Sequence, residues 1–193
     1  TIFSSPAVAN GVVYVGSDDD HLYALDARNG HQLWSFAMGQ GAFAFSSPAV
    51  VHGVVYVGSN DGYVHALDAR TGHQLWNFAT GSGTFVYSSP AVANGVVYVG
   101  SDERFYALDA HTGRQLWNFA TGNTSFSYFS SPTVANGIVY IAWDSLYALD
   151  ARTGRQIGSF ATGGSSFSSP SVINGEVYIG SVSGIIYAFG LPQ

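Results

Sequence analysis

Short apolar runs separated by polar turns follow one another from the start of the chain. Near the N-terminus, the run 6–9 is followed by Asn10-Gly11 and then by the β-rich run 12–15. An Asn-Gly pair between two such runs predicts a tight hairpin, because a type I′ turn needs positive φ angles at both central residues. Apolar runs at 22–25 and 32–36 predict two further strands. This stretch is therefore expected to form a four-stranded antiparallel meander.

The same pattern recurs along the whole chain and is marked by a Ser-Ser-Pro tripeptide. Its successive prolines are 42, 42, 42 and 38 residues apart. A regular period of this length indicates a repeat architecture, in which each copy covers the apolar faces of its neighbours. The 193 residues are expected to form one domain, 1–193, of five copies. The copies cover approximately residues 1–42, 43–84, 85–126, 127–164 and 165–193, with prolines Pro6, Pro48, Pro90, Pro132 and Pro170.

Five four-stranded meanders predict an all-β fold, specifically a five-bladed β-propeller of four-stranded antiparallel blades. The fifth copy contains only three apolar runs, so its blade is expected to have three strands. The strand around Tyr187 would then have an open hydrogen-bonding edge. Because an open edge invites pairing with another chain, either self-association through this edge or a parent protein that continues beyond Gln193 is expected.

A second motif, Ala-x-Asp-x-x-Thr-Gly-x-x-x-Trp, ends at Trp76 in the second copy and at Trp117 in the third. The first copy has Asn29 for threonine and ends at Trp34, whereas the fourth has Gly158 in place of tryptophan. The motif resembles the tryptophan-docking motif of pyrroloquinoline-quinone (PQQ) type propellers. The resemblance implies that each tryptophan packs between adjacent blades. The motif aspartates are expected to brace turns by accepting backbone N–H groups; they are Asp26, Asp68, Asp109 and Asp150.

The copies differ most in the turns between their second and third strands and in the connections between copies. In a meander these two sets fall on the same face, which is therefore the expected binding face. Trp143 stands where the other copies have serine, and it is the residue most expected to contact a partner. A set of aromatic residues is expected near the channel mouth, where it either holds a ligand or fills the core. These residues are Phe3, Phe45, Tyr87, Phe129 and Phe167, with Phe43 and Phe85 close by in the connections.

Composition excludes several functions. With six arginines, no lysine and 12 acidic residues, the net charge is −6, so nucleic acid is not expected as a partner. No apolar run is long enough for a membrane span. PQQ-dependent alcohol dehydrogenases use calcium, an aspartate and a disulfide of adjacent cysteines, but this chain has no cysteine. No cofactor and no metal site are therefore predicted, with Asp18 and Asp20 as weak metal candidates.

Three functions remain open at this stage. The first is a non-enzymatic binding or protein-interaction propeller, with a protein or small-molecule ligand on the variable loop face. The second is an enzyme with a small-substrate site at the channel mouth. The third is an engineered or recently amplified repeat protein without an evolved ligand, which the near identity of the copies favours. The family resemblance alone suggests an extracellular or periplasmic location.

Overall fold

The computed structural model describes residues 1–39, 45–81, 83–120, 130–163 and 168–190. In this part of the chain, 19 strands form five separate antiparallel sheets, and no helix is present. Four sheets have four strands and the last has three. The predicted all-β propeller of five blades, with three strands in the last, is confirmed.

The strand bounds follow the repeat. Blade 1 contains β1 (Ala7–Ala9), β2 (Val12–Gly16), β3 (His21–Asp26) and β4 (Gln32–Ala37). Blade 2 contains β5 (Ala49–Val51), β6 (Val54–Gly58), β7 (Tyr63–Asp68) and β8 (Gln74–Ala79). Blade 3 contains β9 (Ala91–Ala93), β10 (Val96–Gly100), β11 (Phe105–Asp109) and β12 (Gln115–Phe119). Blade 4 contains β13 (Thr133–Ala135), β14 (Ile138–Ala142), β15 (Ser145–Asp150) and β16 (Gln156–Ala161). Blade 5 contains β17 (Ser171–Ile173), β18 (Glu176–Gly180) and β19 (Ile186–Gly190).

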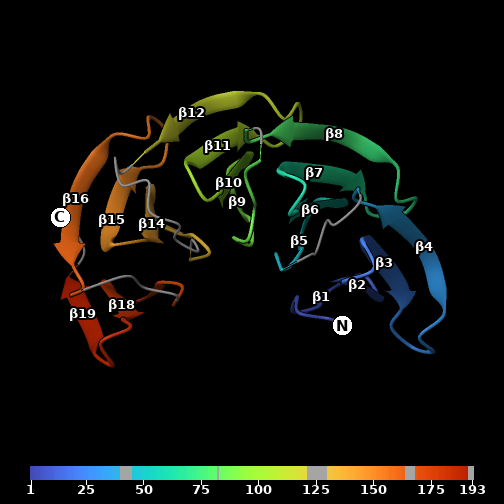
Figure 1. Ribbon diagram of the computed structural model, residues 1–193, viewed down its shortest axis with the longest axis horizontal. Helices are drawn as coiled ribbons and strands as arrows, with labels where there is room; N and C mark the ends of the chain where they lie inside the picture. The colour runs from blue at the N-terminus through green and yellow to red at the C-terminus, as the bar shows by residue number, and fades with distance from the viewer. Residues whose placement is uncertain (40–44, 82, 121–129, 164–167, 191–193) are drawn as a thin grey trace.

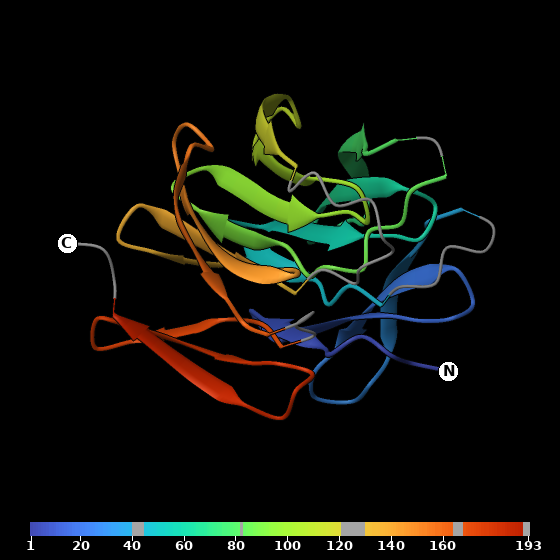
Figure 2. The ribbon, with the colours of Figure 1, turned by 60° about the vertical axis from the view of Figure 1, so that its left-hand side comes forward.

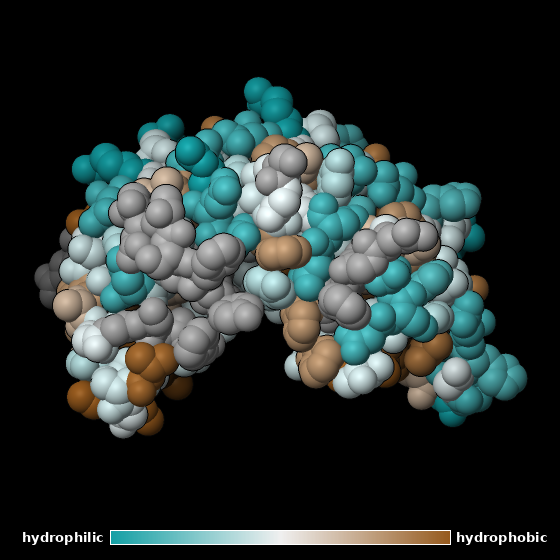
Figure 3. Space-filling model, viewed as in Figure 1, coloured by the Kyte–Doolittle hydropathy of each residue, from teal (hydrophilic) through white to brown (hydrophobic). Residues whose placement is uncertain are grey.

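The blades are arranged around a common centre. The short first strands β1, β5 and β9 lie nearest the centre, and the strands β4, β8, β12 and β16 form the outer rim (Figure 1). The turned view in Figure 2 shows the successive blades side by side along the chain. Figure 1 and the space-filling view in Figure 3 show an arc with a notch between blade 1 and blade 5 on this face.

Tight hairpins join the first two strands of every blade. Asn10 has a φ of 51° and Gly11 a φ of 77°, which are the two positive angles that a type I′ turn needs. The same pair of positive angles recurs in the other four blades, with His52 replacing asparagine in blade 2. The predicted hairpins are therefore present.

Apolar side chains fill the spaces between neighbouring blades. Between blades 1 and 2, for example, Tyr14, Leu22 and Trp34 pack against Val55 and Leu67. Equivalent clusters join blades 2 and 3, 3 and 4, and 4 and 5. The core of this protein therefore lies between the blades, because each sheet has two apolar faces and blades 2 to 4 are covered on both by their neighbours.

The docking tryptophans cross these interfaces. The indole Nε1 of Trp76 donates to the carbonyl oxygen of Ala110 in the next blade at 3.0 Å, and the ring lies over Gly113. A Cβ added to Gly113 would be 2.7 Å from Trp76 Cδ2, so only glycine fits beneath the ring. Trp34 and Trp117 make the same contacts one blade earlier and one blade later.

The Ser-Ser-Pro tripeptides hydrogen-bond the blades together near the centre. The N–H of Ser5 donates to Oγ of Ser47 in the next blade at 2.9 Å. The same link joins Ser47 to Ser89, Ser89 to Ser131, and Ser131 to Ser169. In these serine links the donor always lies in the earlier blade and the acceptor in the next, from blade 1 to blade 5.

Candidate functional site

The two variable sets of loops lie at the same end of the blades. The Gly62 carbonyl, in the β6–β7 turn, accepts hydrogen bonds from Thr80 N and Thr80 Oγ1, in the connection from blade 2 to blade 3. The next turn, β10–β11, is tied to the same connection, because Phe85 N donates to Asp102 Oδ1 at 3.1 Å. Turns and connections therefore build one continuous loop face, which is the face expected from the sequence.

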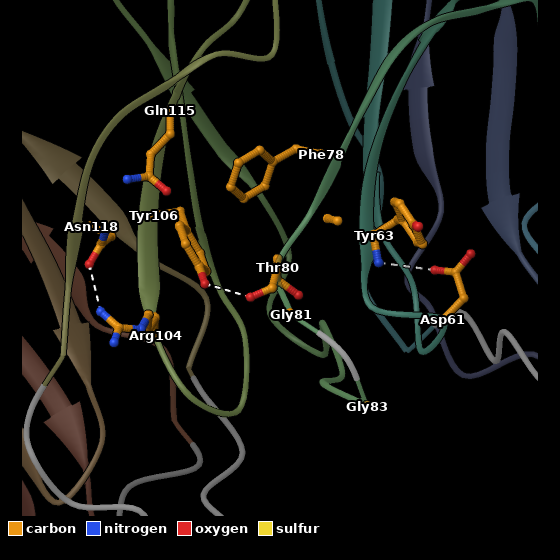
Figure 4. A pocket seen from close by; sticks show the side chains of 11 residues that line it. Asp61, Tyr63, Phe78, Thr80, Gly81, Gly83, Arg104, Tyr106, Gln115 and Asn118 are labelled. Carbon is orange, nitrogen blue, oxygen red and sulfur yellow. Dashed lines mark hydrogen bonds between the residues drawn. The ribbon is translucent and has the colours of Figure 1, made fainter.

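An open pocket of about 790 Å³ is present on this face between blades 2 and 3 (Figure 4). Blade 2 supplies its β6–β7 turn, the end of β8 and the connection that follows β8. Blade 3 supplies the start of β11 and the outer strand β12. The lining residues are Asp61, Tyr63, Phe78, Ala79, Thr80, Gly81, Gly83, Arg104, Tyr106, Gln115 and Asn118.

One wall of the pocket carries a cation beside two amides. Arg104 is exposed, and its Nη1 donates to Asn118 Oδ1 at 2.9 Å. Gln115, also exposed, lies on the same wall. A guanidinium has five N–H donors in a planar fork, so this hydrogen bond leaves further donors for an incoming oxygen ligand.

Between the two blades, the wall is aromatic. The rings of Phe78 and Tyr106 meet edge to face, with centroids 5.2 Å apart. The Tyr106 hydroxyl donates to the Thr80 carbonyl at 2.7 Å, and burial raises the pKa of this phenol. Tyr106 is therefore held as a neutral hydrogen-bond donor that joins the blades and leaves the ring of Phe78 beside the pocket.

The opposite wall contains a carboxylate with a buried histidine behind it. Asp61 Oδ1 accepts the N–H of Tyr63 at 3.1 Å, and Asp61 Oδ2 lies 3.5 Å from Nε2 of His65. His65 is 4% exposed and lies between Gln74, on its own blade, and the ring of Phe36 in blade 1. The carboxylate is thus held by the backbone of its own turn, with His65 behind it.

The aromatic residues predicted near the channel mouth lie together where the structure describes them. Phe3 stacks on Phe45 at 4.9 Å, Phe45 contacts Tyr87 at 5.5 Å, and Tyr87 contacts Phe85 at 5.6 Å. Phe3, Phe45 and Phe85 are all exposed. These rings form a partly exposed ladder across blades 1 to 3. The other members of the predicted set lie outside the described residues: Phe43, Phe129 and Phe167.

Trp143 is not at the surface. Its side chain is 1% exposed, which makes it one of the most buried residues of the chain. Blade 4 has a shorter turn here than blade 2, with Trp143 N bonded to the Ser145 carbonyl at 3.0 Å. The indole fills the interior beside this turn in the present structure, so contact with a partner stays a prediction.

The motif aspartates all accept hydrogen bonds from their own turns. Asp68 Oδ1 accepts Thr71 N at 2.8 Å and Thr71 Oγ1 at 2.7 Å, and these bonds lower the pKa of the carboxyl group. Asp109 and Asp150 make the same pair of bonds. Asp26 accepts from the backbone and the guanidinium of Arg28 instead, which lowers its pKa to about 2.

The residues of this chain do not match the PQQ and calcium chemistry of the dehydrogenases. No cysteine is present for the disulfide. Within the described ranges, no three His, Asp or Glu side chains come close enough to hold a metal ion. Of the two weak metal candidates, Asp18 has its Oδ2 3.5 Å from the amino group of Thr1. Asp20 has a φ of 67°, and its carbonyl oxygen accepts the N–H of Met38 at 2.8 Å. We therefore assign no role to either group.

The pocket residues Asp61, Tyr63 and Arg104 were not among the site residues predicted from the sequence. Comparison of equivalent positions in the five copies, aligned by their strand registers, gives one signal for this site. Arg104 directly precedes the residue paired with Gly100, and the equivalent residues in the other copies are His21, Tyr63, Ser145 and Ile185. In the same way, His65 occupies a position at which the other four copies have tyrosine. Tyr63 and Arg104 line one pocket because blades 2 and 3 are adjacent, whereas His65 packs against Phe36 of blade 1.

Comparison with known proteins supports the propeller assignment. A family model described as outer membrane protein assembly factor BamB matches residues 1–82 and 46–193. No curated protein matches the chain in sequence. In the part of the chain that the structure describes, no helix is long and apolar enough to cross a membrane.

Several solved structures share the fold at low sequence identity. BamB from Moraxella catarrhalis has a TM-score of 0.77 and 21% identity, covering 96% of this chain and 60% of that one. Quinohemoprotein alcohol dehydrogenase from Comamonas testosteroni has a TM-score of 0.83 and 19% identity, covering 98% of this chain and 41% of that one. The computationally designed Ika8 protein has a TM-score of 0.81 and 17% identity, covering 96% of this chain and 57% of that one. The chain spans less than two thirds of each of these proteins. Since the family model covers its whole length, the chain belongs to the BamB-like family of PQQ-type repeat β-propellers.

Proposed function

We propose that this chain is a non-enzymatic interaction propeller that binds a segment of a protein partner on its loop face. The pocket between blades 2 and 3 is the centre of the proposed binding surface. The observation that supports it most is that Tyr63 and Arg104, side chains of a type that no other copy has at this position, line one cavity. A scaffold requirement would favour the same residue in every copy, so deviations that converge on a pocket favour recognition.

The chemistry of the pocket suits an extended peptide with an acidic group. Arg104 forms no ion pair among the described residues, so its guanidinium is available to a carboxylate in a fork-to-fork geometry. The amides of Gln115 and Asn118 can bind main-chain N–H and C=O groups. The rings of Phe78 and Tyr63 offer apolar contact at low conformational cost.

The description of the family adds to this proposal. It names an outer membrane protein assembly factor. We extend to this chain the general role in protein interaction and a location outside the cytoplasm. A catalytic function has less support, because the buried His65 lies behind Asp61 rather than in the pocket.

A peptide-display selection on the immobilised chain tests the proposed site. A random peptide library is enriched on the wild-type protein, and the selected peptides are then measured against Arg104→Glu. The matched control is Arg70→Glu, which makes the same charge change in the β7–β8 turn, at the other end of the blade.

We expect acidic peptides that bind about tenfold or more weakly to Arg104→Glu and unchanged to Arg70→Glu. Equal binding to both variants would place recognition elsewhere. A selection that yields no binder, together with hits on a glycan array, would replace the protein segment with a sugar as ligand.

A further inference from the structure

The repeated interface between blades gives a standard against which the two end blades can be compared. At one position of the third strand, a large apolar side chain points into the next blade and is 0% exposed in each of blades 1 to 4. These residues are Leu22, Val64, Phe105 and Leu146. Each packs against a pair of β-branched residues from the second strand of the following blade, such as Val55 and Val57. We call the face of a blade that packs on the following blade its forward face, and the face that packs on the preceding blade its backward face. Every internal interface therefore joins a forward face to a backward face of different composition.

Blade 5 presents its forward face to solvent. The equivalent residue, Ile186, is 78% exposed, and Ala188, whose counterparts in blades 1 to 4 are fully buried, is exposed as well. Figure 3 shows apolar side chains gathered over β18 and β19, where Figure 1 places blade 5. Exposed apolar side chains in a contiguous patch mark an interaction surface.

Blade 1 presents the complementary backward face. Val13 and Leu25 are half-buried, whereas their counterparts Val55 and Leu67 in blade 2 are 0% exposed. Gly30 has open space above it, where Gly72 and its equivalents carry the indole of the preceding blade. The backward face is thus intact in composition and lacks only the blade that covers it elsewhere.

The chain of serine hydrogen bonds also has two unmatched ends. The N–H of Ser169 occupies the donor position of the link, and Oγ of Ser5 occupies the acceptor position. Neither atom has a hydrogen-bond partner in the described part of the chain. A donor at one end and an acceptor at the other match each other, and neither matches a copy of itself.

We propose that the forward face of blade 5 binds the backward face of blade 1 in a second copy of this chain, head to tail. This interface goes beyond the proposed ligand site, because it uses different blades and a different surface. Ile186 would occupy the place that Leu22 has against blade 2, and Ser169 N–H would donate to Ser5 Oγ of the second copy. The contact is heterologous, so each added copy leaves one face of each kind open.

Two differences make this contact weaker than an internal interface. Blade 5 supplies no docking tryptophan among its described residues, so the space above Gly30 stays unfilled. Glu176 replaces the valine or isoleucine found at this position in blades 1 to 4, and it accepts a hydrogen bond from the Tyr178 hydroxyl. A carboxylate in an apolar interface opposes association unless it is paired. The association is therefore reversible and dependent on concentration.

Sedimentation equilibrium over a wide concentration range tests the proposal. We expect the average mass of the wild-type chain to rise with concentration, at least about a tenfold loss of affinity for Ile186→Glu, and a gain for Glu176→Val. Leu116→Glu is the matched control, because Leu116 is an exposed apolar residue of the outer strand β12, away from both end faces. A monomer at all concentrations, or equal effects of Ile186→Glu and Leu116→Glu, would overturn the proposal.

Disulfide trapping distinguishes this contact from edge pairing of β19. The chain has no cysteine, so introduced thiols are unique. A mixture of Ser5→Cys and Ser169→Cys chains should form a crosslinked dimer, whereas each variant alone should not. The double variant Ser47→Cys/Ser89→Cys reproduces one internal link and serves as the positive control. Crosslinking of Ser169→Cys alone at the rate of the mixture would show a symmetric contact and refute the head-to-tail arrangement.

Discussion

Adding one methyl group beneath a docking tryptophan tests the interface between blades. Gly113 has a φ of +72°, and a Cβ there would be 2.7 Å from Trp76 Cδ2. Gly30 has the same conformation, with a φ of +73°, but nothing lies within 4 Å of its Cβ position. A left-handed conformation costs a non-glycine residue about 1–2 kcal/mol, and this cost applies to both alanine variants. Overpacking against the indole adds about 1–3 kcal/mol for Gly113→Ala alone.

We therefore expect the free energy of unfolding to fall by about 1–2 kcal/mol for Gly30→Ala and by about 2–5 kcal/mol for Gly113→Ala. Urea unfolding followed by circular dichroism and tryptophan fluorescence measures both losses. In a Trp76→Ala background, the cost of Gly113→Ala should drop to that of Gly30→Ala, because the ring that the methyl group meets is gone. Equal losses for the two glycine variants in the wild-type background would refute the docking geometry.

Three further predictions follow from single hydrogen bonds. Tyr98→Phe should cost about 1 kcal/mol of stability, because its hydroxyl donates across the interface at 3.0 Å; Tyr140→Phe should be neutral or stabilising, because its buried hydroxyl has no partner among the described residues. Ser46→Ala should lower the free energy of unfolding by about 1–3 kcal/mol, because the buried N–H of Gly58 loses its acceptor. Thermal melts of the two tyrosine variants and of Ser46→Ala check these results. The pKa of Asp26 is lowered from 3.8 to about 2, so its contribution to stability is complete above about pH 4 and is lost as the pH falls toward 2. Asp26→Asn should flatten the pH dependence of stability in that window, and an unchanged acid limb would contradict the assignment.

Local sequence signals were enough to predict the scaffold. The Asn10-Gly11 turn follows from which residues tolerate positive φ, and the interblade position of Trp76 follows from a motif that recurs in register. The turn recurs in all five copies and the docking contact in three. A signal that occurs several times in one chain can be recognised without any knowledge of the distances between blades.

The candidate pocket could not be predicted in the same way. Arg104 and Asp61 belong to different copies, and their separation depends on the angle between two blades and on the path of the connection 80–86. The burial of Trp143 depends on the size of the space beside a shortened turn. Comparison of the copies shows at which positions one copy has a different residue, but the direction in which that side chain points depends on the packing around it.

The serine links have a consequence for the way such a chain can change in length. Each link joins a backbone N–H in one copy to a hydroxyl in the next, and the residue types are the same at every step. Deletion of residues 43–84 would bring Ser5 to Ser89 and Trp34 to Ala110 with the same pairs of atoms as before. The loss or gain of one whole copy would therefore keep both the serine links and the docking contacts. A change in loop length between two copies also keeps the link: Ser131 and Ser169 are joined at 3.0 Å although their copies are offset by 38 residues, against 42 for the others.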